Sequence, residues 1–174
     1  ADADHIIGIG GGAVLDLAKV VAALAAGDSD PMDHAEVIGG GHPLPHTSLP
    51  FLALPTTSGT GSEVTANAVL TSTEHRVKVS LRGPSMLATV ALVDPALTLS
   101  CPPLVTAQSG MDALTQCLEP LTSRVATPMV DALATSIAPS MTFLPRTSSI
   151  RSIGTCECWH SSDTISIDAR CSSG

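Results

Sequence analysis

The sequence is poor in aromatic and in basic residues. Of its 174 residues, two are Phe, one is Trp and none is Tyr, while Lys and Arg together number 8 against 16 Asp and Glu. The net charge of −8 argues against a nucleic-acid partner, because binding to a phosphate backbone requires clustered Lys and Arg. With so few aromatics, we expect a core of Ala, Val, Leu and Ile, which suits helices packed against a parallel sheet.

Long apolar runs and a basic leader are also missing. No uninterrupted apolar run reaches the roughly 20 residues needed to span a bilayer, and no basic amphipathic helix suggests binding to a membrane surface. The first residues, Ala1-Asp2-Ala3-Asp4, are acidic, whereas a signal peptide begins with basic residues. We therefore predict a cytoplasmic protein without a membrane partner. Because the chain lacks a starting Met and enters an apolar segment within five residues, we also expect further residues upstream.

The cysteines do not form a recognisable framework. Their number is odd and their spacing irregular, which argues against a set of disulfides. The five are Cys101, Cys117, Cys156, Cys158 and Cys171. Cys156 and Cys158 precede His160, but this spacing is not that of a zinc knuckle and no fourth ligand is evident. We therefore predict no metal site in this segment.

The most informative stretch lies near the N-terminus. Residues 6–9 are Ile-Ile-Gly-Ile, which predicts a buried parallel strand. Residues 10–12 are three glycines, which allow a ligand to approach the bare backbone. Good helix formers then run over 14–26. A helix N-terminus directly after a glycine turn offers free N–H groups and a positive dipole end, so we expect it to hold a phosphate.

The spacing of these glycines indicates a bound dinucleotide less specifically than their position between a strand and a helix does. Gly8, Gly10 and Ala13 fit the pattern G-x-G-x-x-A of a dinucleotide fingerprint. The acidic residue expected about 20 positions later should end a strand. The candidates Asp28, Asp30 and Asp33 lie instead in a Gly/Pro-containing loop without a preceding strand. The fingerprint is half satisfied, and a glycine turn without a ligand is the alternative.

A second ligand-like segment follows the next apolar strand, predicted over 51–54. The loop over 55–63 carries five hydroxyl side chains and two glycines: Thr56, Thr57, Ser58, Thr60 and Ser62, with Gly59 and Gly61. Ligands of open α/β sheets lie beyond the carboxyl ends of the strands, where hydroxyl groups can bind phosphate or ribose oxygens. We favour ligand binding here over an ordinary Ser/Thr turn.

The remaining elements follow from local patterns. The sequence predicts, in chain order, a short helix over 32–38, a plain glycine loop over 39–41, antiparallel strands over 66–71 and 76–81 with Lys78 on the second, a buried strand over 88–93, a helix over 107–121 with Thr106 as N-cap, and a helix over 128–137 with Pro at its first position. Residues 139–174 show no periodicity, and we expect a poorly ordered tail there.

Four motifs, in order and spacing, resemble one family. They are Gly10-Gly11-Gly12-Ala13 with Asp16 and Lys19, the segment Pro55 to Thr65, Val93-Asp94-Pro95 with Pro102-Pro103, and Gly110-Met111-Asp112-Ala113-Leu114-Thr115. Over residues 3–138 the chain is similar to the iron-containing (group III) alcohol dehydrogenases. The resemblance implies an α/β fold in which 1–101 form part of a Rossmann-like nucleotide-binding domain. It further implies that 102–138 begin an all-helical metal-binding domain and that 139–174 are a divergent tail.

The resemblance also implies chemistry. Members of the family are oxidoreductases that transfer a hydride between an alcohol carbon and the nicotinamide of NAD or NADP, with iron or zinc as Lewis acid. The substrate would be a small alcohol or aldehyde, and the full-length protein would be a homodimer. Matched by motif, the residues that would bind the cofactor diphosphate are Gly11, Gly12, Ala13 and Asp16. Those at its nicotinamide and ribose end would be Thr56, Thr57, Thr60, Thr65 and Lys78, and Asp112 matches the first metal ligand.

The chain departs from the family pattern in four places. Ala13 replaces the usual Ser, and Gln116 stands where a His ligand is usual, although a neutral amide is a poor ligand for iron or zinc. No His-Gly motif follows Asp112, and the family's first βαβ unit does not precede the glycine turn. We therefore expect an inactive fragment whose register is lost after about residue 138, as a frameshift would cause. Two alternatives remain open: an enzyme similar to maleylacetate reductase that works without metal, and a non-catalytic nucleotide-binding remnant.

Overall fold

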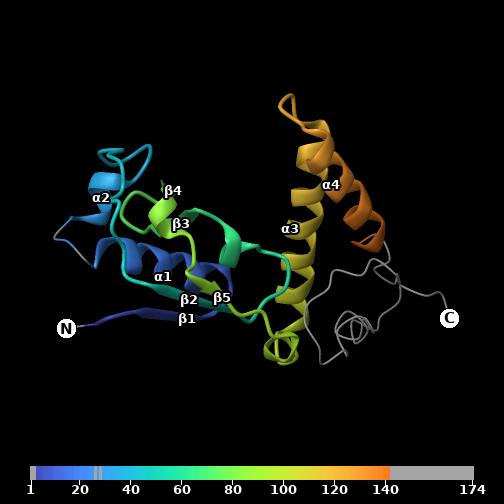
Figure 1. Ribbon diagram of the computed structural model, residues 1–174, viewed down its shortest axis with the longest axis horizontal. Coiled ribbons are helices and arrows are strands. Elements are labelled where there is room, and N and C mark those ends of the chain that lie inside the picture. Colours follow the sequence, from blue (N-terminus) through green and yellow to red (C-terminus); the bar gives the residue numbers. More distant parts are fainter. Residues whose placement is uncertain (1–2, 26, 28, 142–174) are drawn as a thin grey trace. The chain divides into compact units, whose positions relative to one another are not determined.

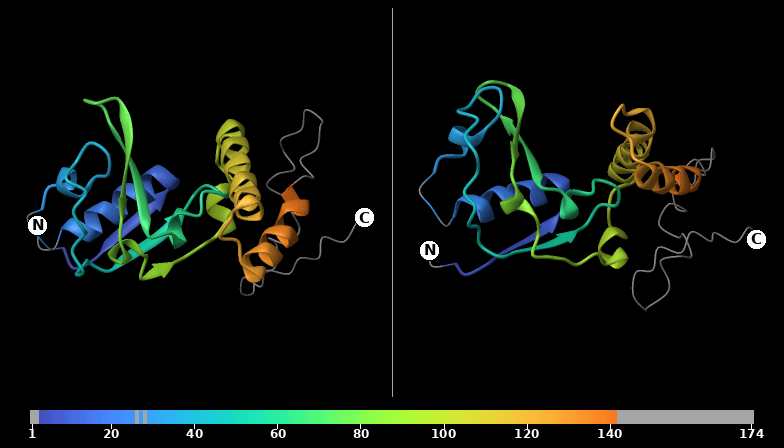
Figure 2. Two further views of the ribbon diagram at one scale, coloured as in Figure 1. Left: turned by 90° about the horizontal axis from the view of Figure 1, so that it is seen from above. Right: turned by 45° about the horizontal axis from the view of Figure 1, so that its top comes forward.

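The computed structural model describes residues 3–25, 27 and 29–141. The chain divides into two units, with the division between Leu97 and Thr98. The first unit contains strands and helices, and the described part of the second is helical (Figures 1 and 2).

A three-stranded parallel sheet forms the base of the first unit. Its order is β1 (Ile6–Gly10), β2 (Phe51–Pro55), β5 (Val90–Ala91). β1 and β2 pair along all their residues, and the pairing continues where the Thr56 amide donates to the Gly10 carbonyl oxygen at 2.9 Å. The parallel sheet and the α/β class predicted from the sequence are thereby confirmed.

Two predictions about burial in this sheet are wrong. The strand expected over 88–93 shortens to β5, which is exposed, because it is an edge strand that pairs with only two residues of β2. In β1, Ile7 and Ile9 are 51% and 58% exposed. They alternate with Gly8, which faces α1, so they point to the opposite face of the sheet.

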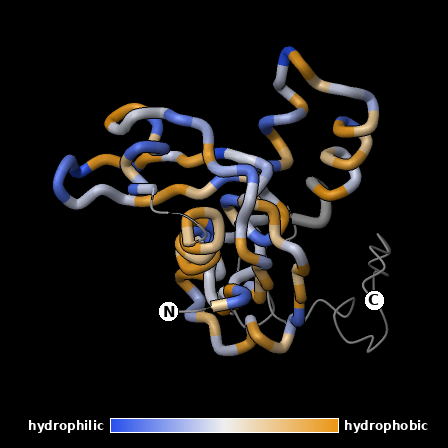
Figure 3. The backbone as a smooth tube through the Cα atoms, turned by 60° about the vertical axis from the view of Figure 1, so that its left-hand side comes forward, coloured by the Kyte–Doolittle hydropathy of each residue, from blue (hydrophilic) through white to orange (hydrophobic). Residues whose placement is uncertain are grey.

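Helix α1 (Gly12–Leu24) is buried on two sides. One side, with Leu15 and Ala22, packs on Phe51 and Ala53 of the sheet. The other side belongs to the cluster that includes Val79 of the hairpin β3 (Asn67–Ser72) and β4 (Val77–Arg82). Most of α1 is accordingly hydrophobic (Figure 3). The helix begins two residues before the predicted start at 14, directly after the glycine turn.

The predicted hairpin is confirmed with a shift of one residue. Its strands are antiparallel, and Lys78 lies on β4 opposite Thr71. Helix α2 (Pro31–His34) is shorter than the predicted 32–38, because the chain is already extended at Ala35 and adopts a φ of 72° at Val37. The predicted glycine loop follows it. Short 3₁₀ turns lie in this unit at Ser62–Val64 and Pro84–Met86, and a third, Pro95–Thr98, spans the division between the units.

The second unit contains two helices, α3 (Pro103–Thr122) and α4 (Pro128–Met141). The prediction that Thr106 caps α3 is wrong, because the helix starts at Pro103, a residue well suited to the first helical position. The Thr106 hydroxyl instead donates to the carbonyl oxygen of Pro102 at 3.3 Å. Helix α4 starts at Pro128 as predicted and runs beyond 137.

The remaining predictions for the second half concern residues beyond Met141. The tail predicted over 139–174, except for its first three residues in α4, lies outside the described residues, as do Cys156, Cys158 and His160. Cys101 and Cys117 are free thiols. In the described part of the chain, every helix is too short or too polar to cross a membrane.

Candidate dinucleotide-binding site

The glycine turn joins the carboxyl end of β1 to the start of α1. Gly11 is the N-cap residue and has an extended backbone, with no side chain to cap the helix. The amide of Val14 donates to the Gly11 carbonyl oxygen at 3.0 Å. The amides of Gly12 and Ala13 precede this first helical bond, at the positive end of the helix dipole. This geometry is suited to binding an anion.

The threonine-rich loop packs against this turn. A Cβ atom added to Gly11 would lie 3.2 Å from Cγ2 of Thr57, and one added to Gly12 would lie 3.2 Å from Cγ2 of Thr60. These distances are tighter than most real contacts of a Cβ atom. The structure therefore brings the two segments predicted to bind a ligand into contact, and glycine at both positions allows that approach without displacing the threonine side chains.

One hydroxyl of the loop lacks a partner. The Oγ1 atom of Thr57 is buried, and no described group of the chain forms a hydrogen bond with it. A buried polar group without a partner costs about 1–3 kcal/mol. A ligand oxygen that reached this hydroxyl would supply the missing partner, and the free amides at the start of α1 suit the phosphate of such a ligand.

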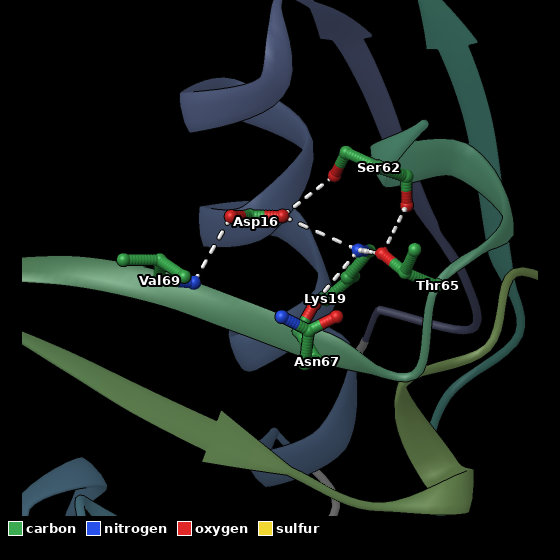
Figure 4. Close-up of polar contacts among 6 residues, drawn as sticks. All are labelled: Asp16, Lys19, Ser62, Thr65, Asn67 and Val69. Carbon is green, nitrogen blue, oxygen red and sulfur yellow. Dashed lines mark hydrogen bonds and ion pairs between the residues drawn. The ribbon is translucent and has the colours of Figure 1, made fainter. Parts of the chain in front are cut away.

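Behind the turn, Lys19 is completely buried. Its Nζ atom donates to Oδ1 of Asp16 at 3.2 Å, to Oγ1 of Thr65 at 2.9 Å and to the carbonyl oxygen of Asn67 at 2.8 Å (Figure 4). Its side chain is 0% exposed. Burial lowers the pKa of the Lys19 ammonium below its usual value of 10.5, and the charges of Asp16 and Glu63 partly oppose that shift.

Asp16 is the second member of this buried network. Its carboxylate accepts hydrogen bonds from the Ser62 hydroxyl at 2.6 Å, from the Val69 amide at 2.9 Å and from Lys19 (Figure 4). The sequence suggested direct contact between Asp16 and the diphosphate, and that contact stays a prediction. The structure shows that the Asp16 carboxylate and the Lys19 ammonium both have hydrogen-bond partners within the chain. Only the three-residue spacing of Asp16 and Lys19 on one helix hinted at the pair in the sequence.

Two other predicted cofactor residues lie apart from the turn. The Thr65 hydroxyl accepts from Lys19 and donates to the Ser62 carbonyl oxygen at 3.3 Å, so it belongs to the buried network. Lys78 is exposed on β4. Its contact with a ribose stays a prediction.

The candidate metal ligands lie on α3. Asp112 and Gln116 are both exposed and lie one turn apart on the same face of α3, with Gln116 Nε2 donating to Asp112 Oδ2 at 3.1 Å. Within the described ranges, no group of three or more His, Cys, Asp or Glu side chains could hold a metal ion. These residues alone therefore do not fit an iron or zinc centre.

Comparison with known proteins identifies the family of this chain. The model of the family "Iron-containing alcohol dehydrogenase" matches residues 1–95, more than half of the chain. The chain belongs to this family. The predicted resemblance is thereby confirmed, and the matched residues include both the glycine turn and the threonine loop.

Relatives within the family are similar over most of this chain. Long-chain-alcohol dehydrogenase 1 of Geobacillus thermodenitrificans is 47% identical over 131 residues, which make up 75% of this chain and 32% of that protein. Choline dehydrogenase of Bacillus subtilis is 40% identical over 129 residues, or 74% of this chain and 32% of that protein. The chain thus spans about a third of the length of the curated relatives that it matches.

A solved structure agrees with this assignment. Sulfoacetaldehyde reductase from Bifidobacterium kashiwanohense, solved in complex with NAD+, superposes with a TM-score of 0.74 at 37% sequence identity. The superposition covers 79% of this chain and 36% of the reductase. The fold of this iron-containing alcohol dehydrogenase chain is therefore that of the corresponding part of the reductase.

Proposed function

We propose that this chain supplies the dinucleotide-binding part of an NAD(P)-dependent alcohol dehydrogenase. The observation that carries the proposal is the unpaired, buried hydroxyl of Thr57 beside a glycine turn at the start of α1. Membership of the iron-containing family supports it, as does similarity to a reductase solved with NAD+.

Each part of the site has a distinct task in this proposal. The amides of Gly12 and Ala13 donate to the diphosphate oxygens. The absence of a Cβ atom at Gly11 and Gly12 lets Thr57 and Thr60 pack against the same turn. Thr57 donates its hydroxyl to a cofactor oxygen. Because Ala13 has no hydroxyl, the backbone amides carry the phosphate contact at that position.

The nicotinamide and ribose end of the cofactor would lie toward the threonine loop. Thr56 and Thr60 are half-buried there, Thr60 directly against Gly12. Lys78 would reach a ribose from the hairpin. A bound cofactor would supply a two-electron hydride acceptor: the carbinol carbon of an alcohol would give its hydride to the nicotinamide, the hydroxyl oxygen would release its proton to solvent, and the alcohol would become an aldehyde.

The substrate of the longer protein would be a small alcohol or aldehyde. The names of two relatives, choline dehydrogenase and sulfoacetaldehyde reductase, support this class. Asp112 is proposed as one ligand of a divalent metal. We place the protein in the cytoplasm, because the free thiols of Cys101 and Cys117 suit a reducing compartment. The full-length protein is proposed to be a homodimer.

A second candidate function is nucleotide binding without turnover. It is favoured by the pairing of Asp112 with a neutral amide, Gln116, in place of further metal ligands. An enzyme that works without metal, similar to maleylacetate reductase, is favoured by the same amide. Assaying the chain with NAD(H), short alcohols and added iron or zinc separates these functions. Tight cofactor binding without turnover selects the non-catalytic nucleotide-binding function. Turnover unaffected by a chelator selects the enzyme that works without metal.

The proposed cofactor site is tested by titrating the 174-residue chain with NADH and following the cofactor's fluorescence. Thr57→Val replaces the hydroxyl by a methyl group of similar size. The dissociation constant of NADH should rise by about one to two orders of magnitude, because a hydrogen bond to a charged acceptor contributes about 1.5–3 kcal/mol. The variant's stability should not fall, since a buried unpaired group is removed.

The matched control is Thr71→Val, which makes the same change at an exposed position of β3. It should leave NADH affinity unchanged. Equal affinity of the wild-type chain and Thr57→Val would contradict the proposed site, as would a wild-type chain that does not bind NADH.

A further inference from the structure

The buried network links three segments that are distant in the sequence. Asp16 and Lys19 come from α1, Ser62 and Thr65 from the 3₁₀ turn that ends the threonine loop, and Asn67 and Val69 from β3 (Figure 4). Asp16 and Lys19 reach partners 46 to 53 residues away. This pair therefore holds the far end of the loop to the same helix whose first turn forms the phosphate cradle.

The loop over 56–65 is anchored at both of its ends. At its start, the Thr56 amide donates to the carbonyl oxygen of Gly10. At its end, Ser62 and Thr65 are bound by Asp16 and Lys19. Thr57 and Thr60, which lie against the glycine turn, are between the two anchors. The position of their hydroxyl groups therefore depends on both anchors.

We propose that the Asp16–Lys19 pair is a positioning device for cofactor binding: it holds the threonine loop against the glycine turn, with the Thr57 hydroxyl facing the cofactor. This inference rests on the proposed dinucleotide function. It assigns Asp16 and Lys19 to positioning, and it needs no contact between either side chain and the cofactor.

A purely structural role predicts a different outcome. Replacing a buried ion pair by apolar or neutral groups of similar size is often neutral or stabilising, whereas removing one partner leaves a buried charge uncompensated. The double variant Asp16→Asn with Lys19→Met should therefore stay folded. If the pair is a positioning device, that folded double variant still has a loosened loop and weak cofactor binding.

The experiment measures two quantities on the full chain. Amide hydrogen exchange without ligand reports how firmly the loop is held, and NADH titration reports affinity. In the double variant, exchange of the loop amides and of the Val69 amide should be about tenfold faster, while β1 and β2 exchange at the wild-type rate. The dissociation constant of NADH should rise about tenfold or more, as expected for losing a charge-assisted hydrogen bond.

A second variant guards against a failure to fold. Ser62→Ala removes only the 2.6 Å bond to Asp16 and keeps both charges paired. Because Ser62 is not among the residues proposed to bind the cofactor, its loss should loosen the loop and weaken NADH binding in the same direction, by a smaller factor. The control is Arg82→Met, which removes the exposed ion pair with Glu36 and should alter neither quantity.

Each outcome is decisive for one proposal. Unchanged loop exchange and unchanged affinity in the folded variants would make the pair purely structural and overturn the inference. Lost affinity with unchanged loop exchange would overturn it in favour of direct contact between Asp16 and the cofactor. If the wild-type chain fails to bind NADH while the variants loosen the loop, the proposed function fails, and the anchoring of the loop by the pair stands.

Discussion

The sharpest stability prediction concerns Gly8, where β1 and α1 approach each other. A Cβ atom at this position would lie 2.9 Å from Cβ of Ala18, 3.0 Å from Cε2 of Phe51 and 3.3 Å from Cδ2 of Leu15. The Ala18 atom is attached directly to the helix backbone and cannot rotate away. In Gly8→Ala, the helix must therefore move away from the strand by several tenths of an ångström to reach ordinary contact distances of 3.4–4 Å.

The size of the effect follows from two opposing terms. Inserting a methyl group into a well-packed core costs about 1–3 kcal/mol. Replacing glycine by alanine recovers about 0.4–1 kcal/mol, because the unfolded chain loses conformational freedom. We therefore expect Gly8→Ala to lower the free energy of unfolding by about 1–2 kcal/mol. Urea unfolding followed by circular dichroism should show a lower midpoint with an unchanged slope.

Gly110→Ala makes the same chemical change without the clash. Gly110 lies inside α3, and among the described residues a Cβ atom there meets nothing within 4 Å apart from its own neighbours and the helix backbone. Alanine should stabilise the helix by about 1 kcal/mol. The packing argument is refuted if Gly8→Ala unfolds at the wild-type urea concentration or above it.

Two further predictions follow from α1 and α3. Between the lowered pKa of buried Lys19 and 10.5, the unfolded chain holds a proton that the folded chain has lost, so wild-type stability should rise with pH relative to Lys19→Met. Urea unfolding of both chains from neutral pH to 10.5 measures this difference, and a difference that falls with pH would contradict the assignment. Thr106→Ala should change the free energy of unfolding by less than about 0.5 kcal/mol, since Thr106 lies within the helix; a loss near 1 kcal/mol in the same assay would restore Thr106 as a cap.

Local patterns were sufficient for most elements of the first unit. The alternation over 66–71 and 76–81 predicted the hairpin, and the apolar segments before the two ligand-like loops predicted β1 and β2. These elements are set by residues close together in the sequence. The second unit was also predicted in outline, although Pro103 starts α3 before the expected cap.

Burial was harder to predict, because it depends on what covers each face. Ile7 and Ile9 are residues typical of a strand that is buried on both faces of its sheet, yet only the face of β1 that carries Gly8 packs against α1. The complete burial of Lys19 depends on Thr65 and Asn67, which are 46 and 48 residues away. Nothing in the helical pattern of 14–26 indicates that a lysine there would be enclosed. The unpaired state of Thr57 likewise depends on contacts between two separate loops.

The site could be predicted in part. Gly11, Gly12, Thr57 and Thr60 meet as the order of strand ends in a parallel sheet suggests. Thr65 lies instead in the buried network, where its hydroxyl accepts from Lys19. The roles of these residues in binding a cofactor stay predictions, and the packing of the loop on α1 decides which of them lie against the glycine turn.

The most direct test of the central claim is an amide NMR titration of the isotope-labelled chain with NAD+. The account predicts that the largest shift changes fall on the glycine turn and the threonine loop, at Gly11, Gly12, Ala13, Thr57 and Thr60. No shifts at millimolar NAD+, or shifts confined to the β3–β4 hairpin, would contradict the claim that this turn and loop form a dinucleotide site.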